Sequence, residues 1–167
     1  DRWEARYRSG HGSISEPPSP FLVEHADLIS GRVLDVAAGA GRHALFLARR
    51  RCIVEAIDIS WTGLHLARAA AVAEGLCLLA VQADLENFPL PSDRYDAVIN
   101  LRYLQRALLP QLRRAVKPGG LILVETFLIE QQTIGHPTHA DFLLQRGELG
   151  AAFSQCDILL YEEGLFE

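Results

Sequence analysis

Short apolar runs and amphipathic segments take turns along most of this chain of 167 residues. The apolar runs are bounded by Gly, Pro, Asp or Ser, which is typical of buried strands. We predict strands at about 32–37, 54–58, 76–81, 94–100, 121–127 and 157–161. Helical spacing predicts helices at about 21–30, 61–74, 104–116 and 146–153. A further helix should begin after the loop that follows the first strand and end at about Arg50. Because strands alternate with helices, we expect a doubly wound, Rossmann-like α/β fold, with a mostly parallel sheet and helices on both faces.

The first strand leads through a small-residue loop directly into a helix, in residues 33–48 (VLDVAAGAGRHALFLA). Such a unit brings the backbone close to a ligand and points free N–H groups at it. The second strand ends in Asp58, and in βαβ nucleotide folds that end lies beside the first loop. A carboxylate there can accept hydrogen bonds from both ribose hydroxyls; the alternative is a cap before the next helix. We favour the ribose interpretation because of its position.

Two ligand classes fit this architecture. The spacing Gly39-x-Gly41-x-x-Ala44 matches the dinucleotide fingerprint with its tolerated final alanine. Asp35 argues against a dinucleotide, because an acid just before the loop repels a diphosphate. The same acid suits a ligand that carries an amine and a sulfonium, as S-adenosylmethionine does.

Five segments, in order, resemble the motifs of class I S-adenosylmethionine-dependent methyltransferases. They are residues 33–42 (VLDVAAGAGR), 56–60 (AIDIS), 82–90 (QADLENFPL), 94–100 (RYDAVIN) and 112–124 (LRRAVKPGGLILV). The flanking residues 3–7 (WEARY) and 18–22 (PSPFL) are similar to those of the small tellurite-resistance-type methyltransferases. We therefore predict a single methyltransferase domain over 1–167, with an N-terminal flap or short leading helix in 1–20 and an α/β core in 21–167.

The resemblance implies a set of contacts to S-adenosylmethionine. Asp35 would orient the loop and help to neutralise the methionine amine, although support of the loop alone explains it equally well. Asp84 would meet the adenine amino group, or would only form a turn before Leu85. Asn100 would meet the ligand amine through its carbonyl or its side chain. The predicted cofactor-binding set is Asp35, Ala37, Gly39, Arg42, Asp58, Ile59, Asp84, Leu85 and Asn100.

Ala37 and Arg42 depart from the simplest form of the motif. Ala37 stands where the commonest pattern has the first of three glycines, so we expect it to need a negative φ and to leave less room at the methionine end. Arg42 begins a helix, where a cation opposes the helix dipole. An anionic partner such as the methionine carboxylate would explain Arg42, and solvent exposure is the alternative.

We predict a small-molecule methyl acceptor, such as an oxyanion, a thiol or a heterocycle. Displacement at a sulfonium needs alignment in a dry site, so a general base is optional, and none is obvious. The N-terminal segment with Trp3 and Tyr7 should fold over the cofactor and face Arg102, Tyr103 and Phe127. Of these, Tyr7, Arg102 and Tyr103 are the candidates for the acceptor mouth.

Composition excludes or disfavours several kinds of partner. Sixteen Lys and Arg against 21 Asp and Glu give a net charge of −5, which disfavours nucleic acid as a partner. No apolar run approaches the roughly 20 residues that span a bilayer, and no signal sequence opens the chain, so we predict no membrane span and a cytoplasmic location. Cys52, Cys77 and Cys156 are interpreted as reduced core thiols. His136 and His139 lack further ligands at a suitable spacing, so we predict no metal site.

Two other functions stay open. The glycine spacing and Asp58 also suit an NAD(P)-dependent oxidoreductase, against which Asp35, Asp84 and the turn at 117–120 argue together. A non-catalytic protein that binds S-adenosylmethionine would keep the same motifs. The resemblance also implies a seventh, antiparallel strand, with residues 161–165 (YEEGL) as the turn into it, so we expect the fold to be incomplete at Glu167. The oligomeric state is not predicted.

Overall fold

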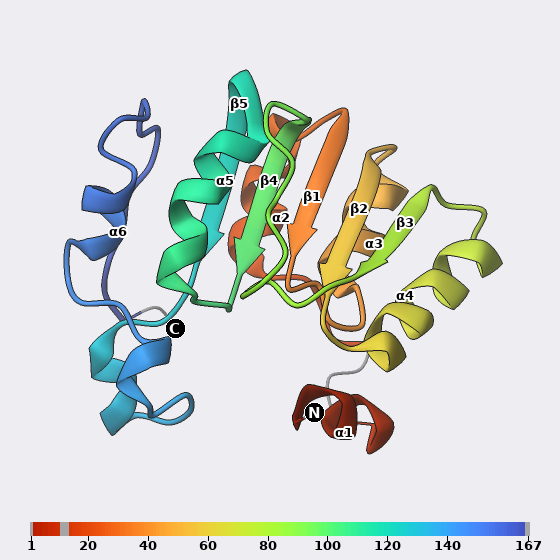
Figure 1. Ribbon diagram of the computed structural model, residues 1–167, viewed down its shortest axis with the longest axis horizontal. Helices are drawn as coiled ribbons and strands as arrows, with labels where there is room; N and C mark the ends of the chain where they lie inside the picture. Colours follow the sequence, from red (N-terminus) through yellow and green to blue (C-terminus); the bar gives the residue numbers. More distant parts are fainter. Residues whose placement is uncertain (1, 11–13, 166–167) are drawn as a thin grey trace.

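The computed structural model describes residues 2–10 and 14–165, and its centre is a five-stranded sheet (Figure 1). The strands are β1 (Arg32–Val36), β2 (Ile53–Asp58), β3 (Leu78–Gln82), β4 (Tyr95–Leu101) and β5 (Val116–Glu125). Their order is β3-β2-β1-β4-β5, and every neighbouring pair is parallel. The predicted doubly wound, parallel α/β fold is therefore confirmed.

Helices cover both faces of the sheet, as the alternation of side chains in the strands requires (Figure 1). The helices are α1 (Arg2–Arg8), α2 (Pro20–His25), α3 (Arg42–Arg49), α4 (Trp61–Ala73), α5 (Leu109–Ala115) and α6 (Glu148–Ala152). On one face, Val33 of β1 belongs to a core cluster with residues of α2, α3 and α4. On the other face, Leu34 belongs to a second cluster with residues of α5. Successive residues of β1 thus serve opposite halves of the core.

The helix expected over 104–116 is shorter in the structure. A 3₁₀ turn spans Arg106–Leu108, and α5 begins only at Leu109, with a proline in its first turn where a missing N–H costs nothing. At the other end, β5 already begins at Val116, so the predicted turn at 117–120 lies inside the strand. The pairing register with β4 shifts there, between Tyr95 and Ala97. The segment is therefore an irregularity in the strand rather than a separate turn.

The strand predicted over 157–161 is wrong. Residues 157–165 contain no strand in the structure. The side chains of Ile158, Leu159, Leu160 and Tyr161 are 41–75% exposed. An apolar run becomes a strand only where a neighbouring strand pairs with its backbone, and this segment runs back along α6, where the ring of Tyr161 lies against Gly150 (Figure 1). The short helix expected just before it is present as α6.

The N-terminal segment contains the short leading helix that the sequence predicts, as α1, which lies at the carboxyl ends of the strands (Figure 1). Asp1 and residues 11–13 of this segment lie outside the described residues. Among the described residues, no helix is long and apolar enough to cross a membrane.

Candidate functional site

The loop between β1 and α3 is shaped by glycines that bring backbone and helices into close contact. Gly39 and Gly41 have φ of 57° and 81°, a region that side chains disfavour. A Cβ on Gly41 would come 2.5 Å from the Cβ of Ala67 in α4, so glycine here lets α3 and α4 pack closely. Likewise, a Cβ on Gly63 in α4 would come 2.9 Å from the carbonyl oxygen of Gly39. The loop therefore lies directly against the first turn of α4.

The backbone conformation of Ala37 differs from the one that we expected. Its φ is +55°, whereas we expected alanine to require a negative φ at this position. The loop keeps the backbone turn that the first glycine of the motif usually makes, and alanine adopts it at a cost of about 1 kcal/mol. The backbone of the loop is thus locally strained at Ala37.

Asp58 ends β2 and ties the loop to the next helix. Its Oδ2 accepts a hydrogen bond from the backbone N–H of Gly39 at 2.8 Å, and its Oδ1 accepts one from the N–H of Ser60 at 2.8 Å. Burial raises the pKa of this carboxyl, although the hydrogen bonds from Ser60 and Gly39 act in the opposite direction. Asp58 therefore makes the cap contact that we weighed as the alternative, and each oxygen keeps a lone pair for a further donor.

Asp35 is buried at 1% exposure under the same loop. Burial, with a smaller contribution from the charge of Asp58, raises the pKa of Asp35 to about 8, while the backbone N–H of Ala44 and the charge of Arg42 lower it. Within the described residues its Oδ2 has no hydrogen-bond partner. A buried carboxyl oxygen without a donor is unfavourable, and a donor or cation from a ligand would relieve that cost.

Asn100 and His43 also carry buried polar atoms that have no hydrogen-bond partner among the described residues. Asn100, near the end of β4, is fully buried, and neither atom of its amide has a partner in the part of the chain that the structure describes. The backbone of Asn100 pairs with that of Val36, so it lies beside the start of the glycine loop. His43, in the first turn of α3, is 5% exposed, and its Nε2 is likewise unpaired within that part. Burial and the charges of Arg42 and Arg102 lower the pKa of His43 to about 4, so its imidazole is neutral at pH 7.

Asp84 forms the turn that was its alternative interpretation. Its carboxylate accepts hydrogen bonds from the N–H of Glu86 at 3.0 Å and from the side chain of Asn87 at 2.8 Å. Leu85 is buried behind it, whereas Ile59, after the end of β2, is 38% exposed. A contact of Asp84 with an adenine ring stays a prediction.

Tyr7 and Tyr103 approach Asp58 from different parts of the chain. Burial raises the pKa of each tyrosine to about 12, and the charge of Asp58 contributes to both shifts. The charges of Glu86 and Asp84 also act on Tyr103. Both tyrosines therefore lie near Asp58 at the end of β2, and Tyr103 lies near Asp84 as well.

Arg42 and Arg102 differ in their surroundings. The Nη1 of Arg42 donates to the carboxylate of Glu16 at 2.8 Å, so the anion that Arg42 meets in this structure comes from the chain itself. Arg102 is exposed, has φ of +59°, and donates its backbone N–H to the carbonyl of Glu125. The side chain of Ser19 also donates to the carboxylate of Glu125. The segment before α2 thus crosses from α3 to the end of β5.

The contacts that sequence reasoning missed come mostly from the first residues. Glu4 accepts hydrogen bonds from Ser60 and Thr62 at the start of α4, and Glu16 pairs with Arg42. Ser60 is the N-cap of this helix, and its side chain accepts a hydrogen bond from the backbone N–H of Gly63. A helix that begins Ser-x-Thr offers spare hydroxyl donors, and this was the only available signal for an acid partner.

No group of three or more His, Cys, Asp or Glu that could hold a metal ion exists among residues 2–10 and 14–165. His136 and His139 are exposed, and the imidazole of His139 lies 3.5 Å from the carboxylate of Asp141. Cys52 is buried, Cys77 is exposed and Cys156 is half-buried; all are free thiols. Cys77 is therefore not the core thiol that we expected.

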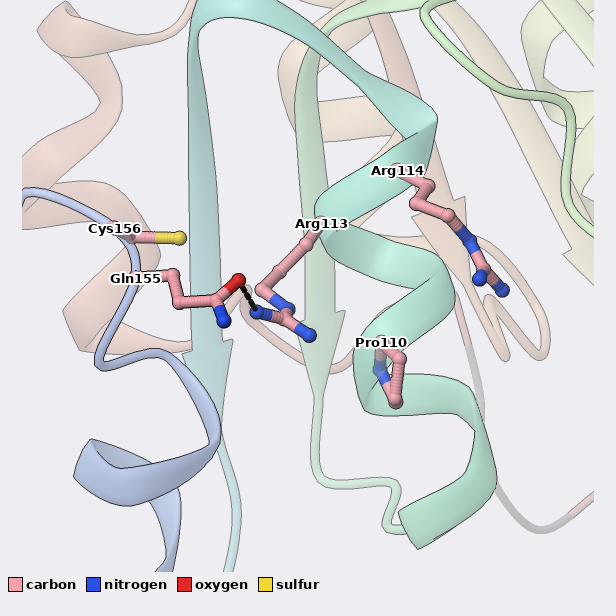
Figure 2. Close-up of a pocket in the computed structure, with 5 residues that line it drawn as sticks. All are labelled: Pro110, Arg113, Arg114, Gln155 and Cys156. Atoms are coloured by element: carbon pink, nitrogen blue, oxygen red, sulfur yellow. Dashed lines mark hydrogen bonds between the residues drawn. The ribbon is translucent and has the colours of Figure 1, made fainter.

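One surface pocket lies away from the loop, between α5 and the segment after α6 (Figure 2). It is lined by Pro110, Arg113, Arg114, Gln155 and Cys156. The guanidinium of Arg113 donates to the side-chain oxygen of Gln155 at 2.9 Å. This pocket is not at the carboxyl ends of the strands, where a parallel α/β sheet binds its ligand.

Comparison with known proteins decides the family. A family model described as a methyltransferase domain matches residues 33–120, more than half of the chain, from β1 into β5. The chain belongs to this methyltransferase family. The methyltransferase family that the five sequence segments resemble is therefore confirmed.

Relatives of known sequence match this methyltransferase over the same region. An uncharacterized protein of Mycobacterium tuberculosis is 32% identical over 123 residues, which cover 70% of this chain and 45% of the relative. A ubiquinone/menaquinone biosynthesis C-methyltransferase of Bordetella avium is 33% identical over 117 residues, which cover 64% of this chain and 45% of the relative. The chain thus spans less than half the length of these curated relatives.

Solved structures agree on the fold. TehB from Haemophilus influenzae superimposes with a TM-score of 0.78 at 19% identity, over 97% of this chain and 58% of that one. A SAM-dependent methyltransferase from Aquifex aeolicus gives a TM-score of 0.63 at 23% identity, over 80% of this chain and 76% of that one. Likeness at this identity establishes the fold and leaves the substrate open.

Proposed function

We propose that this chain transfers the methyl group of S-adenosylmethionine to a small-molecule acceptor. S-adenosylmethionine, when bound, supplies an electrophilic methyl group on a sulfonium. The observation that carries the proposal is Asp35, a buried acid with an unpaired oxygen among the described residues, just before the glycine loop. A cationic amine would satisfy that oxygen and favour its ionised form, whereas a pyrophosphate would offer it neither a donor nor a positive charge.

The remaining residues would contact different parts of the cofactor. Asp58 would accept the ribose hydroxyls on the lone pairs that Gly39 and Ser60 leave free. Asn100 would meet the methionine amine with the amide that has no partner among the described residues. Asp84, beside the buried Leu85, would meet the adenine. This assignment takes the nucleoside to the ends of β2 and β3, and the methionine to the ends of β1 and β4.

The acceptor would lie at the ends of β4 and β5, where the second ligand of such a sheet is received. Arg102 and Tyr103 follow β4 directly. Tyr7 lies against Gly39 instead, so its assignment to the acceptor mouth is less well supported than a role above the cofactor loop. The exposed cation Arg102, together with the neutral imidazole of His43, would suit a small anionic acceptor.

Calorimetry tests the cofactor. We expect S-adenosylmethionine and its demethylated product to bind, and NAD not to bind. We also expect binding at pH 7 to release about one proton from Asp35, because a cation beside this acid lowers its pKa from about 8. Repeating the titration in buffers of different ionisation enthalpy measures that proton. Tight binding of NAD, without heat from the sulfonium donor, would favour the oxidoreductase alternative.

A transfer assay tests the reaction. Labelled donor should methylate members of a panel of small oxyanions, thiols and heterocycles. Binding of the donor without transfer to any acceptor would favour the non-catalytic alternative.

Deletion of residues 1–12 removes α1, which buries no residue, so we expect a much lower turnover with little loss of fold stability. Full turnover by the truncated chain would exclude the N-terminal segment from the site.

A further inference from the structure

Helix α1 is attached to the core by a carboxylate. Glu4 accepts hydrogen bonds from the hydroxyl of Ser60 at 2.7 Å, from the backbone N–H of Thr62 at 3.2 Å and from the hydroxyl of Thr62. Hydrogen bonds from Thr62 and Ser60 lower the pKa of Glu4 to about 2, so it is ionised at neutral pH. Because α1 contains no fully buried residue, these polar contacts supplement the packing of the half-buried Tyr7.

The contacts continue from Glu4 to the cofactor loop. Ser60 is fully buried, and its backbone N–H donates to Oδ1 of Asp58 at 2.8 Å. Oδ2 of Asp58 in turn accepts from the N–H of Gly39 at 2.8 Å. Hydrogen bonds therefore link Glu4 to the hydroxyl of Ser60, and the backbone N–H of Ser60 to Gly39 through the carboxylate of Asp58.

Tyr7 lies three residues after Glu4 and contacts the same loop directly. A Cβ on Gly39 would come 2.1 Å from the hydroxyl of Tyr7, and one on Gly63 would come 3.3 Å from its ring. Tyr7 therefore lies across the junction between the loop and α4. Helix α1 thus contacts both ends of the path that runs through Asp58.

We propose that Glu4 is a positioning residue of the cofactor site, which acts through Ser60 to hold Asp58 in the orientation that receives a ribose. This inference rests on the proposed function. The role is one of orientation, because the negative charge of Glu4 raises the pKa of Asp58 and so opposes its ionised form. A small misplacement of a binding group is costly, so a fixed carboxylate binds its ligand better than a mobile one.

The test is a double-mutant cycle with S-adenosylhomocysteine as the probe. Glu4→Ala should raise its dissociation constant about fivefold, the worth of roughly one hydrogen bond. Glu4→Gln keeps one acceptor oxygen and should restore about half of the loss on a logarithmic scale. In an Asp58→Asn background, Glu4→Ala should change the dissociation constant by less than about twofold, because coupled residues are not additive.

A matched control separates position from charge. Glu74→Gln removes a carboxylate from the other end of α4, where it is exposed and pairs with Arg49, and it should leave binding unchanged. An unchanged dissociation constant in Glu4→Ala would overturn the proposal. So would an equal loss with and without the Asp58 carboxylate, because a merely structural α1 would act in both backgrounds.

A second measurement needs no ligand. Glu4→Ala should speed hydrogen exchange at the amides of Gly39 and Ser60 in the free chain several-fold, while Glu74→Gln should not. If the wild-type chain fails to bind S-adenosylhomocysteine, the proposed function fails, and with it the inference about ribose. Faster exchange would then still show that Glu4 orders the loop, so the two failures are distinguishable. Unchanged exchange at both amides would contradict the proposal by itself.

Discussion

The polar groups at the end of β2 and those at the ends of β1 and β4 lie side by side but are satisfied differently. Asp58 is hydrogen-bonded through both oxygens to backbone N–H groups. Asp35 and Asn100 are as deeply buried, yet within residues 2–10 and 14–165 they carry side-chain atoms without partners. The first group is complete before any ligand arrives. The second carries a desolvation cost that a ligand would repay, which is how a binding site differs from a structural network.

The largest effect should come from replacing the ionisable carboxyl of Asp35 with an amide. Its pKa in the fold is about 8, above the usual value near 4, so its contribution to stability is fully present below about pH 4 and is lost as the pH rises toward 8. At pH 7 this loss approaches about 4 kcal/mol. Asp35→Asn should recover about half of it and should weaken binding of the sulfonium donor.

Chemical unfolding of both proteins at pH 5 and pH 8 tests this. The stability difference between variant and wild type should grow with pH. A difference that shrinks would mean that Asp35 is paired in solution, and the contrast with Asp58 would fall.

Asp58→Ala should act in the opposite sense. It leaves the N–H groups of Gly39 and Ser60 without their acceptor, so the free chain should lose about 1–3 kcal/mol of stability. Binding of S-adenosylhomocysteine should weaken by about 1.5–3 kcal/mol, the worth of a charge-assisted hydrogen bond. Thermal unfolding and calorimetry measure the two losses separately. A stable variant with normal affinity would show that Asp58 serves neither purpose.

Asn100→Leu sharpens the comparison with a smaller effect. Replacing an unpaired buried amide by an apolar group of similar size should stabilise the free chain by about 1 kcal/mol. The same change should weaken the donor's binding, since the proposed contact to the amine is lost. Paired melting curves with and without ligand measure both. If the variant is destabilised, the amide of Asn100 has a structural partner in solution.

Ala37→Gly should have the smallest effect. Glycine removes the strain of a positive φ at 55°, so we expect a gain of about 0.5–1 kcal/mol in stability. Urea unfolding measures it, with Ala73→Gly at the end of α4 as a control that should lose stability. A loss at both positions would mean that Ala37 is not strained.

The positions of the five strands along the chain, the glycine loop and the acids at the strand ends could be predicted because each leaves a local pattern. Ser60 as a cap and Asp58 at a strand end follow from such patterns. The contacts of Glu4 and Glu16 could not be predicted, because they join residues 56 and 26 positions apart through side chains alone. The strand at 157–161 failed for the opposite reason, since its apolar pattern is present but no pairing strand is.

Ala37 shows a third kind of failure. Residue type predicts the preferred φ, but the loop between β1 and α3 imposes its own turn, and the residue accepts the strain. Likewise, the sequence places Asp35 and Asn100 near the ligand but says nothing of which atoms find a partner. Satisfaction of buried polar groups is a property of packing in three dimensions, so it appears only in the structure.

The attachment of α1 through Glu4 and Tyr7 makes the helix an intramolecular ligand of its own domain. A covalent tether within one chain holds such a ligand at an effective concentration in the millimolar range. A free peptide of residues 1–10, added to a chain that lacks them, would compete without that advantage. It would have to be supplied at about millimolar concentration to replace what the tether provides.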